Sequence, residues 1–218
     1  MKRRRLLSMA AAWPALGAAS PAALIAAAEA GDTAALRRLL DAGTPVDVRD
    51  GRGRTALLAA THANRIDAAQ FLIERGADVN AKDAMQDSPF LYAGAEGRLE
   101  ILQLTLAAGA DLASTNRYGG TALIPAAHHG HVEVVRKLLM TKIAIDHVNR
   151  LGWTALLEAV ILGDGGPAHT EIVRLLVAHG AKVNLADAQG VTPLAHAEQR
   201  GQRAVAELLK RAGAKPLR

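Results

Sequence analysis

Residues 117–139 read RYGGTALIPAAHHGHVEVVRKLL, and the pattern of this stretch recurs about every 33 residues along most of the 218-residue chain. The hydroxyl residue within the pattern recurs at Thr55, Ser88, Thr121, Thr154 and Thr192. An alanine follows each of them five positions later, at Ala60, Ala93, Ala126, Ala159 and Ala197. A repeat of this length predicts an array of small units, each of which buries its apolar face against the next.

The apolar spacing within each unit predicts two short antiparallel helices. The Thr or Ser hydroxyl is expected to cap the first helix by accepting from a free N–H of its first turn. The fixed alanine indicates close packing of neighbouring first helices, where a larger side chain would cost about 1–3 kcal/mol. A glycine is expected to end the second helix in a left-handed conformation, at Gly43, Gly76, Gly109, Gly180 and Gly213.

Two positions depart from this pattern. Lys142 stands where the third full unit should have its terminating glycine, and would cost about 1 kcal/mol if it kept the left-handed conformation. Gln86 stands at a glycine position in the loop before Ser88, so this loop is expected to bend differently from the others.

Several short motifs connect the repeat to a known family. They are Thr-Ala-Leu-Leu at 55–58 and 154–157, Thr-Pro-Leu-Ala at 192–195, Gly-His-Val-Glu-Val-Val at 130–135 and Gly-Ala-Asp-Val-Asn at 76–80. In these motifs the chain resembles the ankyrin repeat family. The resemblance implies an all-α fold, a solenoid of helix–turn–helix units with short β-hairpin fingers, used for protein binding and not for catalysis.

The repeat predicts one domain over residues 21–215. An N-terminal cap is expected at about 21–50. Five full repeats are expected at about 51–83, 84–116, 117–149, 150–187 and 188–215.

Residues 1–20 lie outside the repeat. A basic stretch from Lys2 to Arg5 precedes an apolar stretch that ends in small residues, as in a secretory signal peptide. Arg3, Arg4 and the two leucines that follow Arg5 also resemble a twin-arginine signal, and the choice between the two export routes stays open. The alternative is a basic, frayed tail. The predicted location is the bacterial periplasm or the medium.

Removal of this segment changes the charge of the chain. The formal net charge of +5 includes the four basic residues at 2–5, so the mature chain has 22 basic and 21 acidic side chains. A nucleic-acid role is therefore not predicted. The chain has no cysteine, which removes a lipoprotein anchor, and no membrane anchor is expected after signal removal.

The sequence predicts no catalytic residue. A thiol nucleophile is excluded, and neither a Gly-x-Ser-x-Gly elbow nor a His-Glu-x-x-His helix is present. The glycine-rich stretch Gly163–Pro167 lacks the Gly-Lys-Ser/Thr ending of a phosphate loop. It coincides with five extra residues in the fourth full repeat, and is expected to lengthen the turn between its two helices.

The densest histidine cluster is His128, His129 and His131, with Glu133 and His147 nearby. Three imidazoles that converge could hold a transition metal, so a small-ligand or metal-binding protein is the alternative function. Gly130 is expected to end the first helix and to direct its neighbours apart. No metal and no cofactor are therefore predicted.

The remaining candidates lie on the fingers and on the open face of the first helices. They are Arg52, Arg54, Met85, Tyr92, Arg117, Tyr118, His128, Arg150, Leu151, Trp153 and Glu158. Tyr, Trp and Arg are enriched at interface hot spots, and this chain has few aromatic residues. Packing of Trp153 on a neighbouring finger is the alternative for that residue. The predicted function is a periplasmic adaptor that binds an unidentified protein.

Overall fold

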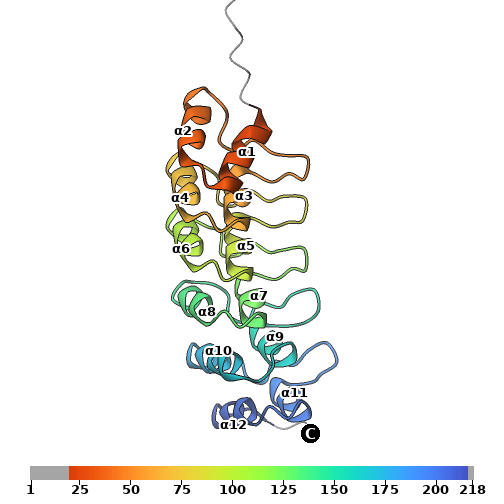
Figure 1. The fold of residues 1–218 in the computed structure, drawn as a ribbon. Coiled ribbons are helices and arrows are strands. Elements are labelled where there is room, and N and C mark those ends of the chain that lie inside the picture. Colours follow the sequence, from red (N-terminus) through yellow and green to blue (C-terminus); the bar gives the residue numbers. More distant parts are fainter. Residues whose placement is uncertain (1–19, 216–218) are drawn as a thin grey trace, which may run out of the picture.

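The computed structural model describes residues 20–215, and the predicted signal segment therefore lies almost entirely outside the described residues. This part of the chain forms twelve helices in six pairs (Figure 1). The pairs are α1 (Pro21–Ala30) and α2 (Thr33–Asp41), α3 (Ala56–His62) and α4 (Ile66–Glu74), α5 (Pro89–Ala95) and α6 (Leu99–Ala107), α7 (Leu123–His128) and α8 (Val132–Leu139), α9 (Ala155–Ile161) and α10 (Pro167–Ala178), and α11 (Pro193–Gln199) and α12 (Arg203–Arg211).

The pairs stack in chain order into a solenoid. Figure 1 shows the first helices in a central column, the second helices on one side of it and the long loops on the other. We call these loops the fingers. Within residues 20–215 the fingers contain no regular strand, and the one isolated bridge joins Arg49 to Thr55. The predicted all-α solenoid is confirmed. No helix of the described part is long and apolar enough to cross a membrane.

Small residues allow the first helices to approach each other closely. The five repeated alanines are fully buried, as the sequence predicts. On α5, a Cβ added to Gly94 would lie 2.8 Å from the Cβ of Ala122, which precedes α7. Real Cβ atoms are essentially never that close, so glycine is required where these two neighbouring repeats meet.

Four of the five predicted hydroxyl caps are present. In the fourth full repeat, for example, Leu157 N donates to Thr154 Oγ1 at 3.2 Å. The exception is Thr121, whose buried hydroxyl has no partner among the described residues. In the other four repeats, the backbone N–H of the residue four positions after the cap donates to the carbonyl of the capping residue. After Thr121 this position is Pro125, which has no N–H to donate. Helix α7 consequently begins only at Leu123.

A pair of isosteric substitutions tests this difference. Thr154→Val should lower the free energy of unfolding by about 1 kcal/mol, because it removes a working cap. Thr121→Val should leave it unchanged or raise it, because the hydroxyl that is lost has no partner. Urea unfolding of both variants measures the effect, and equal losses would contradict the role assigned to Pro125.

The turn at Lys142 is rebuilt. Among the described non-glycine residues only Asn64 and Gln86 have positive φ, so Lys142 does not take the left-handed conformation. Instead the Thr141 hydroxyl donates to Leu138 O at 2.6 Å and accepts from the N–H of Ile143 at 3.2 Å. A side-chain cap thus replaces the glycine turn that ends the second helices of the other full repeats.

Gln86 does keep the left-handed conformation, with φ 64°, so the expectation that this finger bends differently is wrong at this residue. The equivalent Gly53, Gly119, Gly152 and Gly190 have φ between 75° and 81°. Because a side chain is strained in this region, Gln86→Gly should stabilise the protein by about 0.5–1 kcal/mol in urea unfolding. The matched control, Gly53→Ala, should destabilise it. Loss of stability in Gln86→Gly would contradict this account.

The insertion in the fourth full repeat adds more than a longer turn. Five residues, 162–166, now separate α9 from α10, and α10 has 12 residues where the other second helices of the full repeats have eight or nine. Pro167 at the first position of α10 favours this extra helical turn. The extra residues are therefore shared between the connection and the helix.

Candidate functional site

An Asp or Asn in each finger, five residues before its Thr or Ser, fixes the shape of the finger. In the finger before α9, Asn149 Oδ1 accepts from the backbone N–H of Leu151 at 2.9 Å and of Trp153 at 3.0 Å. The same two bonds, to the residues two and four positions later, are made by Asp50, Asp83, Asn116 and Asp187. Such side chains stabilise turns by bonding to nearby backbone N–H groups. These residues were not among the candidates predicted from the sequence, although they recur with the same spacing as the repeat.

The second polar atom of the finger residue can face the first helix. Asp187 Oδ2 lies 2.7 Å from His196 Nε2 on α11, and Asn149 Nδ2 donates to Glu158 Oε1 on α9 at 2.9 Å. Because Asn149 Oδ1 is already used by the backbone, its amide N–H₂ is the group left to face Glu158. Pro125 follows Asn116 by nine residues, as Glu158 follows Asn149. The ring of Pro125 carries no polar side-chain atom that could bond to Asn116.

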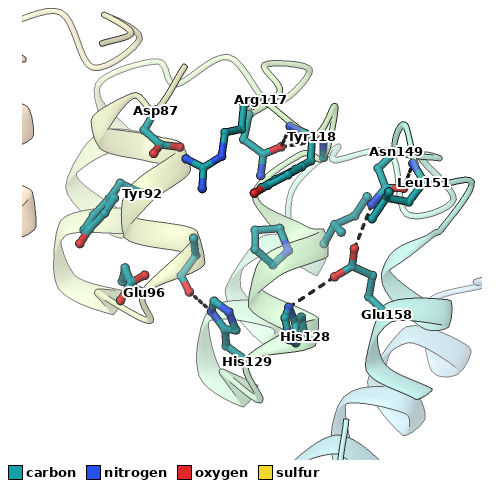
Figure 2. Close-up of a pocket in the computed structure, with 15 residues that line it drawn as sticks. Asp87, Tyr92, Glu96, Arg117, Tyr118, His128, His129, Asn149, Leu151 and Glu158 are labelled. Atoms are coloured by element: carbon teal, nitrogen blue, oxygen red, sulfur yellow. Dashed lines mark hydrogen bonds and ion pairs between the residues drawn. The ribbon is translucent and has the colours of Figure 1, made fainter. Parts of the chain in front are cut away.

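A groove of about 450 Å³ opens over the second to fourth full repeats, between their fingers and first helices. Figure 2 shows Tyr118 and Leu151 on its finger side and Glu158 on the first helix of the fourth full repeat; Pro125 also lines it. Six of the eleven predicted binding residues line this groove: Tyr92, Arg117, Tyr118, His128, Leu151 and Glu158. Asp87, Glu96, Asn116, Ile124 and His129 also line it, and were not among those candidates.

Glu158 is the most buried charged group of the groove, with 6% of its surface exposed. Burial raises its pKa to about 7, while the hydrogen bond from Asn149 and the charge of His129 act in the opposite direction. His128 Nδ1 lies 3.6 Å from Glu158 Oε2. Burial, together with His129 and His169, lowers the pKa of His128. Both shifts favour the neutral forms of these two side chains.

The finger side of the groove is apolar and aromatic. Tyr118 and Leu151 are both about half exposed. The Arg117 guanidinium carbon lies 4.8 Å from the centroid of the Tyr118 ring, within the range of a cation–π contact. This arrangement offers a large apolar area next to a few directional polar groups.

Five predicted binding residues do not line the groove. Arg54 pairs with Asp50 at 2.8 Å, and Arg150 Nη1 donates to Arg117 O on the preceding finger at 2.8 Å. Arg52 and Met85 are exposed on the first two fingers, and Trp153 is half-buried. The structure thus divides the candidates into six that line the groove and five that lie on the fingers outside it.

The remaining histidines of the cluster link neighbouring repeats. His129 Nδ1 and His131 Nε2 lie 2.7 and 3.1 Å from the same carbonyl oxygen of Ala95, and His147 Nε2 lies 2.7 Å from Gly119 O. The contacts with Ala95 O join the third full repeat to the second, and the contact of His147 with Gly119 O joins two neighbouring fingers. Between residues 20 and 215, no three His, Cys, Asp or Glu side chains are placed to hold a metal ion.

Comparison with known proteins identifies the family. The family model described as ankyrin repeats (3 copies) matches residues 9–83 and 90–187. The crystal structure of an ankyrin repeat domain from Acinetobacter baumannii AYE is similar over 88% of this chain and 98% of that one, with 58% identity and a TM-score of 0.86. The ankyrin repeat protein EF0377 matches over the same shares with 43% identity and a TM-score of 0.84.

A curated relative is similar over a shorter stretch. The ankyrin repeat protein YahD of Escherichia coli K12 is 49% identical over 57 residues, which are 26% of this chain and 28% of that protein. The match thus spans less than a third of that relative's length. Family model, solved structures and repeat geometry agree, and this chain belongs to the ankyrin repeat family.

Proposed function

We propose that this protein is a non-catalytic adaptor that binds a partner protein through the groove and fingers of its second to fourth full repeats. Ankyrin repeats are generally scaffolds for protein interaction, and the family is typically non-catalytic. The observation that carries the assignment to this surface is the content of the groove. Both tyrosines of a chain with only 3% aromatic residues, Tyr92 and Tyr118, line it.

The chemistry of the groove supports recognition of a polypeptide. Tyr118 and Leu151 expose apolar surface that no described segment of the chain covers. Arg117, Asn116 and Glu158 place donors and an acceptor around that surface. A partly apolar surface with a few fixed polar groups is typical of the energetically dominant part of a protein interface.

Photo-crosslinking in intact cells tests this assignment. A photoreactive amino acid at position 118 should give a discrete adduct with one protein, and Leu151→Asp should abolish that adduct. The matched control is position 140, where exposed Met140 follows the second helix of the same repeat. The same adducts from positions 118 and 140, or no adduct from 118, would contradict binding in the groove.

The proposed site of action is the periplasm. The basic and apolar composition of residues 1–20 supports export, and Ser20 supports cleavage before it, because Ser20 Oγ accepts from Ala23 N and caps α1. The intact mass of the native protein should lack the first 19 residues. A mass that includes Met1 would overturn the proposal.

The alternative function, a small-ligand protein, is favoured by one observation. His128 and Glu158 lie together in a groove whose volume is within the range of ligand sites. A ligand-dependent rise in melting temperature, without a captured protein partner, would favour this alternative over the adaptor.

A further inference from the structure

Glu158 is a buried carboxylate that no Lys or Arg side chain between residues 20 and 215 pairs with. Its Oε1 accepts a hydrogen bond from Asn149 Nδ2. Its Oε2 lies 3.6 Å from Nδ1 of His128, a side chain whose pKa is lowered by burial. A buried carboxylate that lacks a counter-ion is unfavourable, because it has lost water without gaining an opposite charge.

Two of the three finger carboxylates at this position are paired within the chain. Asp50, in the finger before α3, pairs with Arg54, and Asp187, in the finger before α11, pairs with His196. Asp83, in the finger before α5, is buried and forms no ion pair with a described residue. In the finger before α9 the corresponding residue is the neutral Asn149, and the charge stands instead on the first helix at Glu158. A glutamine there could accept the same hydrogen bond from Asn149 without carrying a charge. The finger contact therefore does not explain the negative charge of Glu158.

The rest of the groove has the same charge preference. Its lining holds three carboxyl groups, on Asp87, Glu96 and Glu158, and one permanent cation, Arg117. Arg117 already shows how a guanidinium lies on this surface, since its charged carbon sits over the ring of Tyr118. Negative charge in a concave, partly apolar site attracts cations.

From these contacts we infer that the groove accepts a basic side chain, Lys or Arg, of the partner polypeptide, with the Glu158 carboxylate as its counter-ion. The aliphatic part of such a side chain would cover Ile124, Pro125 and Leu151, while its charged end reaches Glu158. Pro125 leaves room for this side chain because its ring is small. It also has no hydrogen-bond donor that could compete with the partner's charged group for the Glu158 carboxylate. This inference rests on the proposed function and states which chemistry in the partner the groove recognises.

A titration of the full chain with single-residue probes tests the inference. Nuclear magnetic resonance would follow the Asn149 side-chain amide and the Leu151 and Trp153 backbone amides during addition of N-acetyl-lysine methylamide or N-acetyl-arginine methylamide. At least one basic probe should bind saturably, with a Kd of about 1–10 mM as expected for so small a ligand. The neutral probe N-acetyl-norleucine methylamide should not bind saturably.

Two matched variants assign the effect to the carboxylate. Glu158→Gln should weaken binding of the basic probe at least about tenfold, which corresponds to roughly 1.4 kcal/mol. Glu133→Gln, which removes an exposed charge on α8, should leave the affinity unchanged. Equal binding of the norleucine probe, or an unchanged affinity in Glu158→Gln, would overturn the inference.

The crosslinking experiment separates this inference from the proposed function. If position 118 captures a partner equally well in the Glu158→Gln protein, the groove is an interface but the basic side chain is wrong. If the basic probe binds through Glu158 and no partner protein is captured, the cation site stands and the adaptor function fails.

Discussion

Glu158→Gln is expected to stabilise the protein by about 3 kcal/mol above pH 7 and to have no effect near pH 4. Burial raises the pKa of Glu158 to about 7 from an ordinary value of 4.5. At low pH the carboxyl group is protonated in both the folded and the unfolded chain, so its ionisation does not change the free energy of unfolding. As the pH rises from 4.5 to 7, the unfolded chain ionises first and the folded state loses stability. Glutamine removes this loss and keeps the bond from Asn149.

Urea unfolding of the wild type and the variant from pH 4 to pH 8 measures this difference. The other titrating groups are common to both proteins, so the difference curve isolates Glu158. Asn149→Asp is the matched opposite change: it would place a second carboxylate against Glu158, whose Oε1 now lies 2.9 Å from Asn149 Nδ2, and should destabilise the protein most above pH 7. A difference curve that is flat with pH would contradict the buried, unpaired state of Glu158.

Phe90→Ala is expected to lower the free energy of unfolding by about 3–5 kcal/mol. Phe90 lies on α5 with none of its surface exposed, and is the largest of the fully buried side chains in the described part of the chain. The other full repeats have leucine at this position. Truncation would remove a large apolar group and leave a cavity that its neighbours only partly fill.

Urea unfolding followed by circular dichroism measures the loss, and hydrogen exchange shows where it falls. Because stability in a repeat array depends on contacts between neighbours, amides of α5 and α6 should lose the most protection. Phe90→Leu is the control: it restores the leucine of the other full repeats and should cost less than about 1.5 kcal/mol. If Phe90→Leu were as destabilising as Phe90→Ala, the loss would not arise from an unfilled cavity.

Most of the architecture was predictable, because contacts within a repeat join residues that are close in the sequence, and the same contacts recur in each repeat. The same spacing that places Ala126 in the sequence buries it between neighbouring first helices. Glycines such as Gly109 end second helices with positive φ, because their place in the pattern requires that backbone conformation. The effect of Pro125 on α7 could also have been predicted, since a missing N–H is a property of the residue itself.

The turn at Lys142 was less predictable, because two solutions compete there. A lysine can be held in the left-handed conformation at a cost, or the turn can be rebuilt around another group. The Thr141 hydroxyl supplied the second solution, and its geometry depends on where Leu138 O lies after α8 has packed. Gln86 shows the opposite outcome, since the finger around it keeps its shape and the residue accepts the strain.

The candidate site was likewise predictable only in part. The sequence alone determined the repeat, the stacked helix pairs and the open face on which Tyr118, Leu151 and Glu158 stand, because each of these follows from residue type and spacing. Only the tertiary structure decided that these three side chains share one groove, that Arg150 instead bonds to the preceding finger, and that Glu158 is buried with no Lys or Arg of the described residues paired to it. The physical reason is that burial and charge pairing depend on how closely one repeat is stacked on the next, a distance that side chains from several repeats set together.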